Sequence, residues 1–156
     1  MFVGHYAAAI AIAATRPRKK GLLSYLSFCA VLPDLLMMTS SLFHTTLNYH
    51  ADIGLLYCLI AVLAIGSLFR FERTHLYLGV LSLGLHLPLD YFYMSSDSTN
   101  LYAHPWMDFI LESLLILTAS FFFVKRHDIH SKKLKWFALA ISLIILFQAF
   151  WNFYIN

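Results

Sequence analysis

Long apolar runs separated by short polar segments divide the chain into six parts. The runs cover residues 2–15, 21–44, 51–69, 75–94, 105–124 and 134–155. All but the first are close to the ~20 residues that an α-helix needs to cross ~30 Å of hydrocarbon. We therefore expect an all-α integral membrane protein. About six helices, the first of them short, would form one compact transmembrane bundle over residues 1–156.

The composition supports the membrane assignment. Hydrophobic residues make up 60% of the chain and charged residues 12%, whereas about a quarter of the residues of a soluble domain are charged. Most of the surface must therefore face something other than water. The basic cluster RPRKK follows the first apolar run instead of preceding it, so we interpret that run as a retained helix and not as a secretory signal. Cys29 and Cys58 lack a CxxC partner and are expected to pack as small apolar side chains.

The basic residues predict a topology. All eleven Lys and Arg fall in the connections after the first, third and fifth runs, or on their flanks. They are Arg16, Arg18, Lys19, Lys20, Arg70, Arg73, Lys125, Arg126, Lys132, Lys133 and Lys135. Short cytoplasmic loops collect Lys and Arg, so these connections are predicted to be cytoplasmic and both termini to lie outside. The same rule explains the net charge of +3, and we expect no nucleic-acid partner.

Five ionisable residues are expected at membrane depth, mostly in the outer half: Asp34, His86, Asp90, Asp108 and Glu112. A carboxylate at that depth is costly unless it is paired, protonated or bound to a cation, so such residues are functional candidates by default. No Lys or Arg is predicted at the same depth. Protons or a metal ion are the remaining partners.

The spacing of His86 and Asp90 favours a metal. Residues four apart on a helix share one face and reach a single ion, and imidazole with carboxylate suits Zn²⁺, with Mn²⁺ or Fe²⁺ as alternatives. Pro33 and Pro88 each free the carbonyl four residues earlier, and a freed carbonyl in lipid needs protein, water or a cavity beside it. A polar pocket in the outer half is expected. The alternative is that His86 and Asp90 only hydrogen-bond each other to hold helices together.

Five short motifs occur in a recognisable order: GHYAAAI, AVLPDLL, HTTLNYH, LGLHLPLD and AHPW. This order resembles the YdjM-like family of bacterial inner-membrane proteins assigned as metal-dependent hydrolases, over roughly the first two-thirds of the chain. The resemblance implies a metal site formed by His5, Asp34, His50, His86 and Asp90, with His44 replacing or joining His50.

Two positions depart from the family pattern. Leu36 stands where the family often has a second acidic residue after Pro-Asp, and Asn48-Tyr49-His50 stands in place of its Thr-His-Ser. The resemblance therefore bears more on the presence of a metal site than on the identity of a substrate.

The leading hypothesis is a zinc hydrolase of the inner membrane that acts on an ester or phosphoester of a lipid or lipid-linked substrate at the outer leaflet. Asp108 or Glu112 would serve as a base or an orienting group. No GxSxG motif is present, which disfavours a serine hydrolase. The alternatives are a proton- or cation-coupled transporter, a haem-binding electron carrier and a non-catalytic scaffold.

Overall fold

Every regular element in the described part of the chain is a helix. A computed structural model describes residues 2–17, 19–42, 53–86, 88 and 104–155. The helices are α1 (Phe2–Ala14), α2 (Leu22–Leu42), α3 (Ile53–Leu68), α4 (Arg73–Gly84), α6 (Pro105–His127) and α7 (Ser131–Phe150), and a π-helical turn, Trp151–Ile155, continues α7. These six helices confirm the prediction of an all-helical fold.

Helix α4 ends before the middle of its apolar run. The run extends from 75 to 94, but the helix ends at Gly84 and the Leu85 amide donates to the Leu81 carbonyl at 2.9 Å. Gly84 is the residue whose carbonyl Pro88 leaves without an amide donor. His86 follows the end of α4 by two residues and is itself in a helical conformation.

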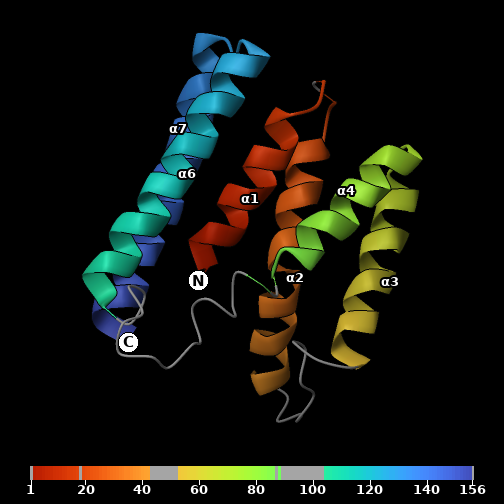
Figure 1. The fold of residues 1–156 in the computed structure, drawn as a ribbon, viewed down its shortest axis with the longest axis horizontal. Helices are drawn as coiled ribbons and strands as arrows, with labels where there is room; N and C mark the ends of the chain where they lie inside the picture. The colour runs from red at the N-terminus through yellow and green to blue at the C-terminus, as the bar shows by residue number, and fades with distance from the viewer. Residues whose placement is uncertain (1, 18, 43–52, 87, 89–103, 156) are drawn as a thin grey trace.

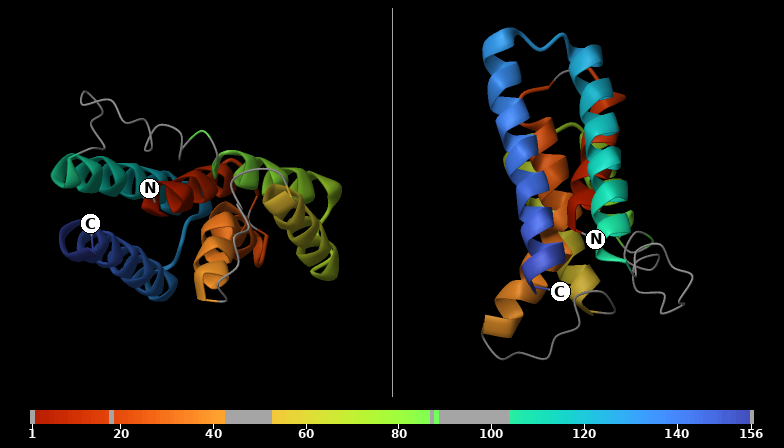
Figure 2. Two further views of the ribbon diagram at one scale, coloured as in Figure 1. Left: turned by 90° about the horizontal axis from the view of Figure 1, so that it is seen from below. Right: turned by 90° about the vertical axis from the view of Figure 1, so that its left-hand side faces the viewer.

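Helix α1 lies at the centre of the molecule, between the α6–α7 pair and helices α2–α4 (Figures 1 and 2). Its sequence of alanines allows close approach on several sides. Ala9 and Ala13 belong to a core shared with α2, α3 and α4, whereas Val3, Ala7 and Ile10 belong to a core shared with α6 and α7. The short first helix thus joins two hydrophobic cores.

Tyr25 fixes the contact of α2 with α3 and α4. Its hydroxyl donates to the Val62 carbonyl at 3.1 Å. Gly66 and Gly79 face this ring, and a Cβ at either position would overlap with Tyr25 atoms. The predicted packing of the cysteines is also confirmed, because Cys29 and Cys58 are free, buried thiols in this core.

Two helices of the described part are long and apolar enough to cross a membrane: Pro105–His127 and Ser131–Tyr154. Only 28% and 11% of their most apolar stretches are buried. Their exposed side chains include Leu114, Phe121, Leu143 and Leu146. The core helix of a soluble protein is mostly buried, so exposed apolar faces of this kind are compatible with contact to lipid.

The described basic connections lie at one end of the bundle, the upper end in Figure 1. Lys19 Nζ, after α1, donates to Glu72 Oε1, before α4, at 3.1 Å. At the end of α6, His127 Nε2 lies 3.2 Å from the Ala13 carbonyl oxygen. The connections after α1, α3 and α6 are therefore neighbours, as the distribution of Lys and Arg predicts.

Candidate metal centre

Three residues from different parts of the chain meet inside the bundle. His5 Nδ1 lies 3.4 Å from Asp34 Oδ2, and His86 Nε2 lies 3.5 Å from Asp34 Oδ1. One potential ligand atom from each residue lies within 4.8 Å of the others. The two imidazoles are buried, with 1% and 0% exposure, and the Asp34 side chain is 14% exposed. The carboxylate thus lies between the two histidines with little access to water.

The three residues are brought to the centre by three different helices. His5 lies at the end of the first turn of α1, the helix that both cores surround. Asp34 follows Pro33 within α2, which continues through the proline. His86 follows the end of α4, and α4 packs along α2. The three donors therefore depend on how α1, α2 and α4 pack together.

The His86 ring is held by a second contact with α2. Its Nδ1 lies 2.8 Å from the Ala30 carbonyl oxygen. A carbonyl only accepts a hydrogen bond, so Nδ1 is the donor in this contact, and Nε2 is the nitrogen that faces Asp34. Ala30 and Asp34 are four residues apart on one face of α2. One helix face thus both orients the His86 ring and supplies the carboxylate.

The rings of His5 and His86 are stacked, with centroids 3.9 Å apart and an interplanar angle of 19°. Two axial haem ligands lie on opposite faces of the macrocycle and point at the iron from either side. Rings that stack directly on each other leave no space for a porphyrin between them. This geometry disfavours a haem held by His5 and His86 together.

The donor set fits a divalent transition metal. Zinc binds imidazole nitrogen and carboxylate oxygen at about 2.0–2.2 Å, which in a tetrahedron places neighbouring ligand atoms about 3.4 Å apart. The His5–Asp34 and His86–Asp34 distances, 3.4 Å to one carboxylate oxygen and 3.5 Å to the other, are close to that separation, and the three ligand atoms lie within 4.8 Å of one another. The hydrogen bond from a ligand histidine to a backbone carbonyl is also typical of metal sites. These residues are therefore suited to hold an ion such as Zn²⁺.

Glu112 lies against the start of α1. Its carboxylate accepts hydrogen bonds from the amides of Val3 at 3.3 Å and Gly4 at 3.4 Å. The first amides of a helix lack partners within the helix, and its positive end attracts an anion. Because Gly4 directly precedes His5, this contact fixes the turn of α1 that carries the histidine.

Asp108 has a different set of partners, on α7 and its π-helical extension. It accepts hydrogen bonds from Gln148 Nε2 at 3.0 Å and Asn152 Nδ2 at 2.6 Å. Asn152 also bonds the Pro105 carbonyl and accepts from Gln148. This buried network joins the first turn of α6 to the end of α7.

The sequence-predicted residues therefore separate into three groups. His5, Asp34 and His86 come together, as the resemblance implies. Asp108 and Glu112 are buried, but their described hydrogen bonds go to α7 and α1, and their role as a base stays a prediction. The other predicted ligands, His44, His50 and Asp90, lie outside the described residues.

Gln148 and Asn152 were not predicted as partners of Asp108. They are polar residues four apart in an otherwise apolar segment. This spacing places both on one helix face, and it is the signal from which a polar contact could have been inferred.

In comparisons with protein-family models, curated proteins and solved structures, the chain has no match. The resemblance of its motifs to a family of membrane hydrolases therefore stays a prediction.

Proposed function

We propose that this chain is a membrane-embedded, metal-dependent hydrolase, with a divalent ion, zinc in the first instance, held by His5, Asp34 and His86. The observation that carries the proposal is the convergence of these three donors, from α1, α2 and the segment after α4, within 4.8 Å of one another. The Ala30 contact, which orients the His86 ring with Nε2 toward Asp34, supports the same assignment.

The three residues together would supply the ligand atoms and the charge that a catalytic divalent ion requires. Among the described residues of the cluster, Asp34 is the acidic ligand and would partly compensate a divalent cation, and the two histidines would supply imidazole nitrogens. Three protein ligands leave a coordination position open for water or substrate, as catalytic zinc sites do. When bound, zinc would polarise an ester or phosphoester oxygen and acidify a water molecule. His50 and Asp90 are candidates for further ligands on sequence grounds.

The position of the cluster suggests an amphiphilic substrate. His5 lies at the start of α1, whereas the basic connections follow its other end. With the basic end in the cytoplasm, the cluster lies in the half of the membrane that faces outward. A lipid or lipid-linked ester or phosphoester in the outer leaflet of a bacterial inner membrane is the substrate class that we propose.

Metal content is the first test. The protein, purified in detergent after growth with added metals, should contain about one zinc or similar ion per chain. Asp34→Asn and His86→Ala should lose most of it. Asp108→Asn, a buried carboxylate outside the cluster, and His130→Ala, an exposed histidine, are the matched controls and should retain it. Wild-type protein without Zn, Mn, Fe or Co would refute the proposal.

Hydrolysis is the second test. Metal-loaded protein in mixed micelles should release product from fluorogenic lipid esters or phosphoesters, and removal of the metal by a chelator should stop the reaction until zinc is restored. Asp34→Asn should be inactive under all these conditions. Full metal occupancy without turnover on either substrate class would favour the non-catalytic scaffold over the hydrolase.

A further inference from the structure

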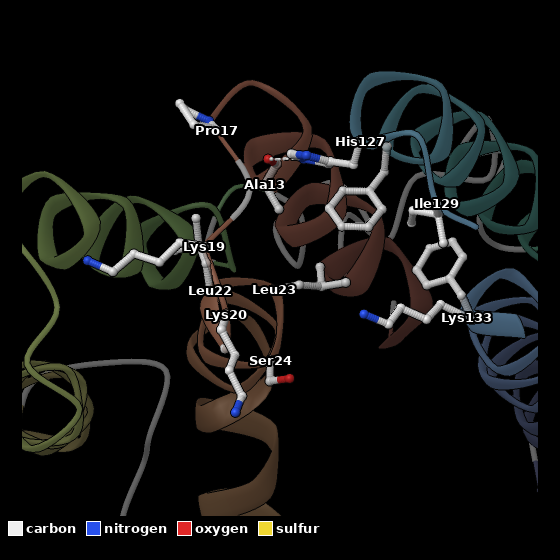
Figure 3. Close-up of a pocket in the computed structure, with 13 residues that line it drawn as sticks. Ala13, Pro17, Lys19, Lys20, Leu22, Leu23, Ser24, His127, Ile129 and Lys133 are labelled. Atoms are coloured by element: carbon white, nitrogen blue, oxygen red, sulfur yellow. Dashed lines mark hydrogen bonds between the residues drawn. The ribbon is translucent and has the colours of Figure 1, made fainter.

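A second candidate site lies at the basic end of the bundle, away from the metal centre. A cavity of about 290 Å³ opens between the start of α2 and the turn that joins α6 to α7 (Figure 3). Lys19, Lys20, Ser24, His127 and Lys133 are its polar lining residues, and Leu23, Phe123 and Phe137 are among its apolar ones. Eight residues of α1 separate His5 from Ala13, which also lines the cavity, or about 12 Å along the helix. The cavity is therefore a separate feature from the histidine cluster.

A second cavity, of about 430 Å³, lies on the α3 side of α2. Its apolar lining is formed by Tyr25, Phe28, Ile65, Phe69 and Phe71. The two cavities share four lining residues, Lys19, Lys20, Gly21 and Ser24. Two apolar grooves thus meet at one polar site, where α2 begins.

The shared site is electropositive. Lys19 is engaged with Glu72 and lies 5.6 Å from the centre of the Phe71 ring. Lys20 and Lys133 line the cavity without a described ion pair. In Figure 3 the Lys133 side chain extends from α7 toward α2, on the side where Ser24 lies. The first-turn amides of α2 add the positive end of a helix. Among the described residues that line either cavity, none is acidic.

The left-handed turn at Gly21 brings these groups together. Gly21 has a φ of 82°, a conformation that glycine adopts without the strain of a Cβ. It separates Lys20 from the first residue of α2, and the Tyr25 amide donates to its carbonyl at 2.9 Å. The lysine therefore lies directly beside the amides of the helix start.

We propose that this site binds an anionic phospholipid of the leaflet at the basic end. The phosphate would be held by Lys20, Lys133, Ser24 and the first turn of α2, and the two acyl chains would lie in the two grooves on either side of α2. The site matches a phospholipid in charge and in shape, because a phospholipid has one anionic group and two apolar chains, and the site has one basic centre and two apolar grooves. A free phosphate would leave the aromatic walls unused, and basic pockets between membrane helices on the cytoplasmic side commonly bind anionic head groups.

The test compares lipids against the purified full-length protein in detergent. Phosphatidylglycerol should raise the midpoint of thermal unfolding and be retained in native mass spectra, whereas phosphatidylcholine and inorganic phosphate should do neither. The double variant Lys20→Gln/Lys133→Gln should bind phosphatidylglycerol about tenfold more weakly or worse. The control Lys132→Gln/Lys135→Gln removes the same charge from the same end but lines neither cavity, and it should bind as the wild type does.

A further variant distinguishes loss of lipid binding from loss of folding. Ser24→Glu adds an acid to the first turn of α2, which favours the helix but repels a phosphate, so binding should be lost with thermal stability retained. Equal loss in the two double lysine variants would reduce the effect to general charge attraction and overturn the proposal. A stabilisation that inorganic phosphate alone reproduces would overturn it as well, since the site would then be one for a free anion.

Discussion

The imidazole rings of His5 and His86 are stacked 3.9 Å apart, and one nitrogen of each lies within 3.5 Å of an Asp34 oxygen. The stack gives the two rings a packing role that is separate from their nitrogen donors. A substitution that keeps a ring and removes the nitrogens therefore distinguishes the two roles.

His86→Phe is that substitution. We expect the variant to fold, with a free energy of unfolding reduced by about 1–3 kcal/mol because the Ala30 carbonyl loses its donor, and to lose its zinc. The measurements are metal content and thermal unfolding of the detergent-purified protein. Zinc retained by a folded Phe variant would show that His86 is not a ligand.

Glu112→Ala tests the contact between α6 and the start of α1. The amides of Val3 and Gly4 would lose their acceptor, and we expect a loss of stability of about 1–3 kcal/mol. Zinc affinity should fall by about tenfold, the lower end of the range for residues that orient a ligand, because the turn that carries His5 is released. Competition with a chromogenic chelator measures the affinity.

The control for Glu112 is Asp108→Asn, one turn away on α6. Asp108 contacts Gln148 and Asn152 and makes no described hydrogen bond with α1. This variant should lower stability and leave zinc affinity unchanged. If both variants lower the affinity equally, the effect comes from general loosening of the bundle.

Gly79→Val tests the close packing around Tyr25. The added side chain would overlap with the Tyr25 ring, and overpacking of this kind costs about 1–3 kcal/mol. Gly84→Ala is the matched control, since a Cβ at Gly84 meets no atom within 4 Å. Thermal unfolding should show a lower midpoint for the first variant and little change for the second.

Glu72 predicts a pH dependence of stability. Its hydrogen bond with Lys19, and then the charge of that lysine, hold the pKa of the exposed Glu72 carboxyl below its ordinary value of 4.5. The contact therefore stabilises the folded state above pH 4.5, and the stabilisation is lost as the pH falls through the lowered pKa. Glu72→Gln should unfold at a slightly lower temperature than wild type at pH 7, and the difference should disappear in acid and in high salt. Asp128→Asn, an exposed acid at the same end of the bundle, should show no such difference.

Hydropathy and charge were sufficient to predict the helices and the gathering of the basic connections, because both depend on local composition. Helix α4 is the exception. Its apolar run continues past Gly84, so composition predicts a longer helix, whereas α4 ends at the residue whose carbonyl Pro88 leaves without an amide donor.

The cluster of His5, Asp34 and His86 was only partly predictable from the sequence. The spacing of His86 and Asp90 suggests two ligands on one helix, and this stays a prediction because Asp90 lies outside the described residues. Among the described residues, the structure places His5 and Asp34, from other helices, beside His86. Such contacts depend on tertiary packing, which no local spacing encodes. For the same reason the sequence could place Asp108 and Glu112 on one face of α6 but not assign the first to α7 and the second to α1.

The central position of α1 has a consequence for the order in which the protein assembles. The chain is made from the N-terminus, so His5, Asp34 and His86 are all present before α6 is synthesised. The hydrogen bonds from Val3 and Gly4 to Glu112 span 109 and 108 residues, and they form only after α6 has entered the membrane. The contacts of α1 with α6 therefore form late in synthesis. A metal ion bound before then would hold α1 against α2 and His86 until α6 and α7 have been synthesised and pack against α1.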